Sequence, residues 1–389
     1  MKKDSIVFIT GSKSSLPFIK EAKKRGFKAI VIDNDPECVS KAIADNFALF
    51  SAANEESILN YLKGVSDEFE IKGVITYSSL PFALSTASRI SHEYGLPSFN
   101  KESVEITYNK DALQHALMSS KCNVPKTFRN LGELSFKDSQ VNFPAVLKLK
   151  SGIGSLGTKI INSIEELKQN IAQGQPNDFI LQEYIDGPLM HIDGFITDGE
   201  PHFLTLFQKL THMVNSIPLT KGFMHAPDEF KHHEKLQALI SSISDFIHKT
   251  KMDNNFFGAD FIYSEAENDF YLLEIGYLMD VKVDRLLFHS GINPYSLLID
   301  ISMGKEISIN LEDINHNLAL EFIYPIKTGY FVKIKSKDIE FEWEKDNPEV
   351  KNLPNSVADI LGWGIYDTNT FSSIPDYLMK QIQGKGSFK

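Results

Sequence analysis

The first third of the chain alternates short apolar runs with helical patterns, and this alternation constrains the fold more than any other feature. The apolar runs are Ile6–Thr10, Ala29–Ile32 and Val74–Tyr77. A strand–helix–strand repeat of this kind predicts a parallel sheet with right-handed crossovers and helices on both faces. Ligands bind at the carboxyl edge of such doubly wound sheets, so we expect a crevice there. It should lie near Gly11, Asp33 and Ser78.

The middle of the chain has a different pattern, which predicts an α+β part. Asn109 is a good N-cap for an amphipathic helix, and after Pro125 the chain reads as successive strands. The expected strands are Ala145–Lys150, Lys159–Ile161, Phe179–Ile185, His191–Thr197 and His202–Gln208. A long helix is expected at about 231–250, followed by a hairpin of Phe256–Tyr263 and Phe270–Ile275. We expect four parts, at residues 1–105, 106–187, 188–309 and 310–389, the last a small β-rich segment.

Charge and cysteine content narrow the class of protein. The formal net charge is −11, and because phosphate backbones favour basic surfaces we expect no nucleic-acid partner. Cys38 and Cys122 form no disulfide framework, which fits a reducing compartment. The N-terminal apolar run is too short for a signal peptide or a membrane span. We therefore expect a cytoplasmic protein without membrane contacts.

A glycine-rich stretch follows the first strand of the middle part. It reads FPAVLKLKSGIGSLGTKII from Phe143, and Lys148 lies on the same strand face as Val146 and Lys150. Backbone amides in a loop with Gly152, Gly154 and Gly157 can surround phosphate oxygens, since glycine permits close approach. A flexible hairpin with solvated lysines would give the same pattern.

Two lone acids mark the expected hairpin. Asp260 and Glu274 are the only charges in their strands, and they pair directly if the turn is centred at residue 267. Two facing carboxylates on a half-buried sheet repel each other, and a bound Mg²⁺ would remove that conflict. The alternative is a solvated face that carries both acids. Upstream, Glu183 shares a face with apolar residues in FILQEYIDG, which reads unaided as an edge strand and a turn.

The order of these features resembles the ATP-grasp superfamily, and most closely its carboxylate–amine ligases, such as the amino-acid ligases and carbamoyl-phosphate-synthetase-like members. The resemblance covers about Ile6 to Gly304. It implies a pre-ATP-grasp domain, a two-lobed ATP-grasp fold, and ATP and Mg²⁺ between the lobes. The implied contacts are Lys110 and Lys148 at ATP phosphates or adenine, Ser155 and Gly157 in the phosphate-covering loop, Glu183, Tyr184 and Ile185 at the adenine, and Asp260 and Glu274 on Mg²⁺.

Several positions depart from the family pattern. Leu189 stands where an acid usually binds the ribose, and Gly276 and Leu278 replace a metal-ligating residue and an arginine. Lys282 and Arg285 are the candidates to supply the missing cation, although nothing in the sequence places them in the site.

The resemblance implies that a carboxylate is activated as an acyl phosphate and joined to an amine, with release of ADP. The partners would be small carboxylates and amines, including amino acids, and a homodimer is the common oligomeric state. The altered positions keep open a second reading, a catalytically impaired nucleotide-binding or regulatory protein. A third, a dinucleotide-binding dehydrogenase module, fits poorly because Gly11–Leu16 lacks the GxGxxG spacing.

Overall fold

The computed structural model describes residues 1–119, 122–132, 141–151, 157–172, 175–214, 217–325, 329–344, 349–350, 354 and 359–382. The first half of the chain contains β1 (Lys3–Ile9), α1 (Leu16–Lys24), β2 (Lys28–Asp33), η1 (Val39–Ile43), β3 (Asn46–Leu49), α2 (Glu55–Gly64), β4 (Phe69–Ile75), α3 (Pro81–Glu93), α4 (Lys101–Tyr108), α5 (Lys110–Met118), β5 (Thr127–Phe128), β6 (Ala145–Leu149), β7 (Lys159–Ile161), α6 (Ile164–Ile171), η2 (Pro176–Asp178), β8 (Phe179–Glu183) and β9 (Leu189–Thr197). The second half contains β10 (Glu200–Val214), β11 (Ile217–His225), α7 (Asp228–Lys231), α8 (Leu236–Thr250), β12 (Asn255–Ser264), β13 (Asp269–Tyr277), α9 (Val283–His289), α10 (Pro294–Ser302), β14 (Leu318–Ile323), β15 (Gly329–Tyr330), β16 (Ile339–Trp343), β17 (Glu349–Val350), β18 (Gly362–Asp367) and α11 (Asp376–Ile382).

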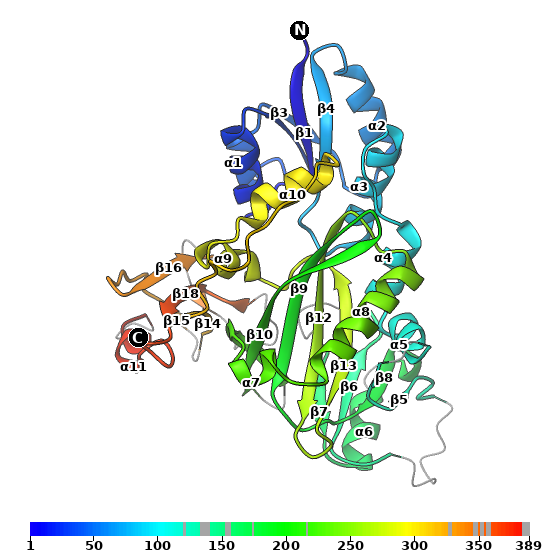
Figure 1. Cartoon of the computed structure of the whole chain (residues 1–389), viewed down its shortest axis with the longest axis vertical. Coiled ribbons are helices and arrows are strands. Elements are labelled where there is room, and N and C mark those ends of the chain that lie inside the picture. The colour runs from blue at the N-terminus through cyan, green and yellow to red at the C-terminus, as the bar shows by residue number, and fades with distance from the viewer. Residues whose placement is uncertain are drawn as a thin grey trace.

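The N-terminal sheet confirms the parallel α/β prediction. Its strands are parallel, in the order β3-β2-β1-β4 (Figure 1). Strand alternation divides its apolar side chains between two cores, one beneath α2 and α3 and the other beneath α1. The second core is closed by α10, which returns from far along the chain to pack on α1 and β4. Arg25, the residue after α1, fixes this return through a 2.5 Å ion pair with Asp300 of α10.

At the carboxyl edge of this sheet, a hydrogen bond within the chain occupies the backbone amide after β1. The backbone N–H of Gly11, two residues after β1, donates to Asp33 Oδ2 at 2.6 Å. A side chain at position 11 would also approach Cys38 Sγ to 2.8 Å. The amide that a pyrophosphate would need is therefore already bonded, which speaks against the dinucleotide-binding alternative.

A small antiparallel sheet follows, in the order β5-β8-β6-β7. One face packs on α6, where Leu147 and Leu181 meet Leu167 and Ile171. Asn109 caps α5 as expected, because its side chain accepts hydrogen bonds from the backbone N–H groups of Asp111 and Ala112. The other face of the sheet is turned toward the central sheet and carries Lys148.

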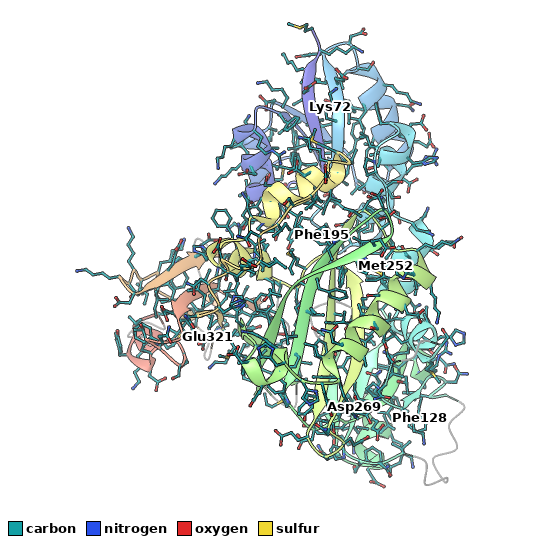
Figure 2. The ribbon with its side chains drawn as sticks, in the orientation of Figure 1. Lys72, Phe128, Phe195, Met252, Asp269 and Glu321 are labelled. Carbon is teal, nitrogen blue, oxygen red and sulfur yellow. The ribbon has the colours of Figure 1, made fainter. Side chains whose placement is uncertain are left out.

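The central sheet has eight strands, in the order β13-β12-β9-β10-β11-β14-β18-β16. Helix α8 covers one face, where Ile243 and Phe246 belong to the same core as Met190 and Phe257 (Figure 1). The opposite face carries Phe195 and Phe256 at one end, near the N-terminal sheet (Figure 2), and charged residues beyond them.

Two sequence expectations are corrected here. The long helix expected at about 231–250 is α8, which ends at Thr250 but begins only at Leu236, after the short helix α7 and residues 232–235. The strand at 202–208 is much longer, since β10 runs from Glu200 to Val214 and pairs with β11, which was not expected.

The C-terminal strands do not stand apart from the central sheet. β14 pairs with β11, β18 pairs with β14, and β16 pairs with β18. The four-part division of the chain remains a prediction, with the addition that three strands of the last part extend the sheet of the third. Within the described ranges, no helix is both long and apolar enough to cross a membrane.

Candidate active site

The charged face of the central sheet is built from three neighbouring strands. Asp260 on β12 pairs directly with Glu274 on β13, which confirms the expected register, and a bulge follows between Asp260 and Phe261. On its other side Asp260 pairs with His191 of β9. Directly paired residues share a face, so these three side chains form one row across the sheet.

His191 is buried between two carboxylates. Its Nδ1 lies 2.6 Å from Asp260 Oδ1 and its Nε2 lies 2.9 Å from Asp193 Oδ2. The second contact lacks hydrogen-bond alignment, so both oxygens of Asp193 are without a hydrogen-bond partner among the described residues. Burial lowers the pKa of His191, but Asp193 and Asp260 outweigh it and raise the pKa to about 10. We therefore treat His191 as an imidazolium at neutral pH.

Lys209 extends the row from β10. Its Nζ lies 2.7 Å from Asp260 Oδ2 and 2.5 Å from Asp280 Oδ2, and its side chain is only 10% exposed. Burial opposes the charge, but the two carboxylates raise the pKa of Lys209 above its ordinary value. In turn, although burial raises the pKa of Asp260, Lys209 and His191 hold it well below the usual range. Asp260 is thus an ionised carboxylate with one cation at each oxygen.

The two predicted phosphate-contacting lysines face this row. Lys110, the first residue of α5, lies 3.4 Å from Glu274 through its Nζ. Burial lowers the pKa of Lys148 to about 8, and its charge also interacts with Glu274, Lys110 and Asp260. The structure therefore brings together four predicted residues, from the small sheet, the helix that precedes it and the hairpin.

Strand β8, which was predicted to contact the adenine, directs Glu183 to the face of the small sheet opposite Lys148. Glu183 pairs with Ala145, whose side chain is buried on the α6 side of the small sheet. By strand alternation the Glu183 side chain lies on that side too, opposite Lys148, and its Oε2 accepts from the backbone N–H of Lys126 at 3.3 Å. Tyr184 is partly exposed and Ile185 is buried.

The phosphate-covering loop is described only at its end. Ser155 lies outside the described residues. Gly157 has φ of +72°, and a side chain there would approach Leu149 to 2.5 Å, so this position requires glycine.

Lys282 and Arg285 do not point at the Asp260–Glu274 row. Lys282, in a left-handed conformation, lies 2.5 Å from Glu344 and over the ring of Trp363. Arg285 donates to the Tyr295 hydroxyl at 2.9 Å and lies 3.6 Å from Asp284. Acids and rings of this chain hold both cations, and Lys209 is the cation that contacts Asp260.

Gly276, one of the positions that depart from the family pattern, leaves open space beside Glu274. The point where a Cβ of Gly276 would stand has no heavy atom of another segment within 4 Å. Gly276 pairs with Gly258, so two glycines lie side by side next to Asp260 and Glu274. Leu278 is buried, with φ of +72°, and its backbone N–H donates to Phe256.

Sequence reasoning missed His191, Asp193, Lys209 and Asp280. One signal was present, because His191 and Asp193 stand two residues apart in an otherwise apolar strand and hence on one face. Lys209 carried no such signal, since β10 was expected to end at Gln208.

No protein-family model matches the chain. The carbamoyl phosphate synthase large chain of Caldanaerobacter subterraneus is 22% identical over 381 residues, which cover 94% of this chain. The chain spans only 32% of that relative's length.

Solved structures match over nearly the whole chain. The L-amino acid ligase from Bacillus licheniformis superposes with a TM-score of 0.76 at 17% identity, covering 98% of this chain and 97% of that one. The biotin carboxylase domain of the Hydrogenobacter thermophilus 2-oxoglutarate carboxylase, solved with MgADP and bicarbonate, gives 0.70 at 16% identity, covering 94% and 86%. The chain therefore has the ATP-grasp fold that these structures share.

Proposed function

We propose that the chain is a Mg²⁺-dependent, ADP-forming ligase that activates a carboxylate as an acyl phosphate and joins it to an amine. The observation that carries this proposal is the meeting of Lys110 of α5 and Lys148 of β6 with Asp260 and Glu274 of the hairpin. Two lysines opposite two carboxylates give one surface for phosphate oxygens and one for a divalent cation.

The donor set fits both groups. Mg²⁺ prefers a few carboxylate oxygens completed by water and phosphate, and each oxygen of Asp260 keeps acceptor capacity beyond its present contact. Asp260 and Glu274 would hold the ion, which neutralises charge on the transferring phosphoryl group. Lys110 and Lys148 would orient the phosphates, because positioning and electrostatics dominate phosphoryl transfer.

The remaining predicted residues have more limited roles in this proposal. The base would meet the backbone of Glu183, Tyr184 and Ile185, since the Glu183 side chain lies on the other side of its sheet. The loop that contains Ser155 and Gly157 would cover the phosphates and exclude water from the acyl phosphate. Lys282 and Arg285 would act at the substrate only after exchanging their present acidic partners.

A second function, nucleotide binding without turnover, is favoured by the pair Gly258–Gly276. The hairpin offers no side-chain ligand at position 276, and Leu278 brings no positive charge. In that case the protein would bind ATP and Mg²⁺ and release no phosphate.

The test is phosphate release from ATP and Mg²⁺ in the presence of pools of amino acids and other carboxylates. We expect release that depends on a substrate pair and is lost in Asp260→Asn and in Glu274→Gln. Asp269→Asn is the matched control, because Asp269 lies at the far end of the same hairpin and pairs with Lys235 (Figure 2). Tight ATP binding by calorimetry without release from any pool would replace the ligase with the binding protein.

A further inference from the structure

The cluster around Lys209 has the geometry of a cation site that the chain fills itself. One ligand atom each from His191, Asp260 and Asp280 lies within 4.8 Å of the others, close enough to hold a single metal ion. Strands β9 and β12 and the turn after β13 bring these three residues together. The Lys209 ammonium lies among them, in contact with both carboxylates.

Lys209 reaches this position across a neighbouring strand. β9 separates β10 from β12, and Lys209 spans it to contact Asp260. The same ammonium contacts Asp280, which lies between β13 and α9. To pair with one carboxylate, Lys209 would not need to lie between two. Its place between Asp260 and Asp280 offsets the repulsion that these two carboxylates would otherwise exert on each other.

We propose that the Lys209 ammonium is a built-in cation that occupies the place of a divalent ion between Asp260 and Asp280. Lys209 is thus a positioning residue: it fixes Asp260 beside Glu274 and closes the His191–Asp260–Asp280 cluster to metal. The proposal deepens the proposed function, since it leaves Asp260 and Glu274 as the place for one divalent ion. The open space at Gly276 agrees with this, because the hairpin supplies no further ligand there.

Replacing Lys209 with an uncharged residue removes the positive charge between Asp260 and Asp280. With methionine at position 209, Asp260 and Asp280 would face each other with no cation between them. A set of one imidazole and two carboxylates suits Mn²⁺, which would relieve this repulsion and displace the proton of His191. Arginine at this position would keep the charge and keep the cluster closed.

The experiment counts Mn²⁺ ions by electron paramagnetic resonance on the full chain without nucleotide. We expect Lys209→Met to bind one more Mn²⁺ per chain than the unchanged protein, and Lys209→Arg to bind the same number. Adding Asp280→Asn to Lys209→Met should remove the extra ion. Lys221→Met is the matched control, because Lys221 lies on β11, the strand next to that of Lys209, and its ion pair, 3.0 Å from Glu321 of β14, lies outside this cluster (Figure 2).

Two results would overturn the proposal. Lys209→Met could fold, by circular dichroism, and bind no additional ion. Alternatively, Asp280→Asn alone could remove an ion from the otherwise unchanged protein, which would mean that metal already displaces Lys209. If Lys209→Met fails to fold, Lys209→Gln and the single Asp280→Asn variant still decide the matter. Because the count needs no nucleotide or turnover, it is independent of whether the ligase proposal holds.

Discussion

Lys148 combines a buried position with a charge that phosphate binding would require. Burial, with Lys110 and Lys209, lowers the pKa of Lys148 to about 8, against the opposing effect of Glu274 and Asp260. Above pH 8 the folded protein has lost this proton, whereas the unfolded chain keeps it until about pH 10. The unfolded state then binds more protons, so this group's contribution to stability rises with pH between these values.

Nucleotide binding should show the opposite dependence on pH. ATP phosphates favour the ammonium form of Lys148, so above pH 8 binding requires proton uptake. We expect ATP affinity to fall by up to about tenfold per pH unit above pH 8, the limit for one linked proton. Calorimetry in buffers of different ionisation enthalpy measures the uptake. Lys148→Arg, which stays charged, should bind ATP without it, and equal uptake in both proteins would exclude Lys148 as the group involved.

At the scale of elements, three ion pairs join the α9 segment to the β16 segment. Arg285 and His289 lie four residues apart on one side of α9, and Lys282 directly precedes the helix. These three cations lie 3.9, 3.5 and 2.5 Å from Glu342 and Glu340 of β16 and from Glu344, which directly follows that strand. This ladder holds the edge strand of the central sheet against the segment that follows the hairpin.

The rungs of this ladder should differ in their contribution to stability. Glu344→Gln leaves the 7% exposed Lys282 without its carboxylate. We expect it to lower the free energy of unfolding by about 2 kcal/mol, somewhat less than breaking a fully buried pair. Glu340→Gln, in contrast, removes a largely exposed partner of His289 and should cost less than about 0.5 kcal/mol. Urea denaturation of both variants tests this, and equal costs would argue against a special role for Lys282.

The sequence predicted the Asp260–Glu274 pair of the hairpin but not the positions of the cations around it. The Asp260–Glu274 pair could be placed because the two strands are adjacent in sequence, although the bulge after Asp260, which shifts the register of the turn by one residue, was not predicted. The position of Lys209 could not, because it depends on three strands pairing in the order β12-β9-β10. The orientation of Lys282 and Arg285 likewise depends on β16, which lies more than fifty residues further along the chain.

At the scale of the whole molecule, the alternation of strand and helix patterns in the first hundred residues predicted the parallel sheet. It did not predict that α10 covers part of that sheet. Phe18 of α1 packs edge-on against Tyr295 of α10, with ring centroids 5.0 Å apart. No local pattern near α1 indicates that its partner lies at residues 294–302, since that contact belongs to the tertiary fold. A boundary drawn at residue 105 therefore separates a sheet from part of its own core.

This contact predicts how an N-terminal fragment should behave. Residues 1–105 alone would expose the apolar surface of α1 and β4 that α10 covers. We expect the fragment to bind the dye ANS and to unfold without a cooperative transition. Mixing it with a synthetic peptide of residues 292–304 should reduce dye binding. A soluble fragment with a sharp thermal transition and no dye binding would show that α10 is dispensable.

The place of β18 has a consequence for how the protein is made. β18 lies between β14 and β16, so the last of these strands to leave the ribosome is inserted between two that are already there. Until residue 367 is synthesised, β14 presents an unpaired edge and β16 has no neighbour in the sheet. Open strand edges recruit other chains, so the nascent protein is most vulnerable to association before β18 has left the ribosome.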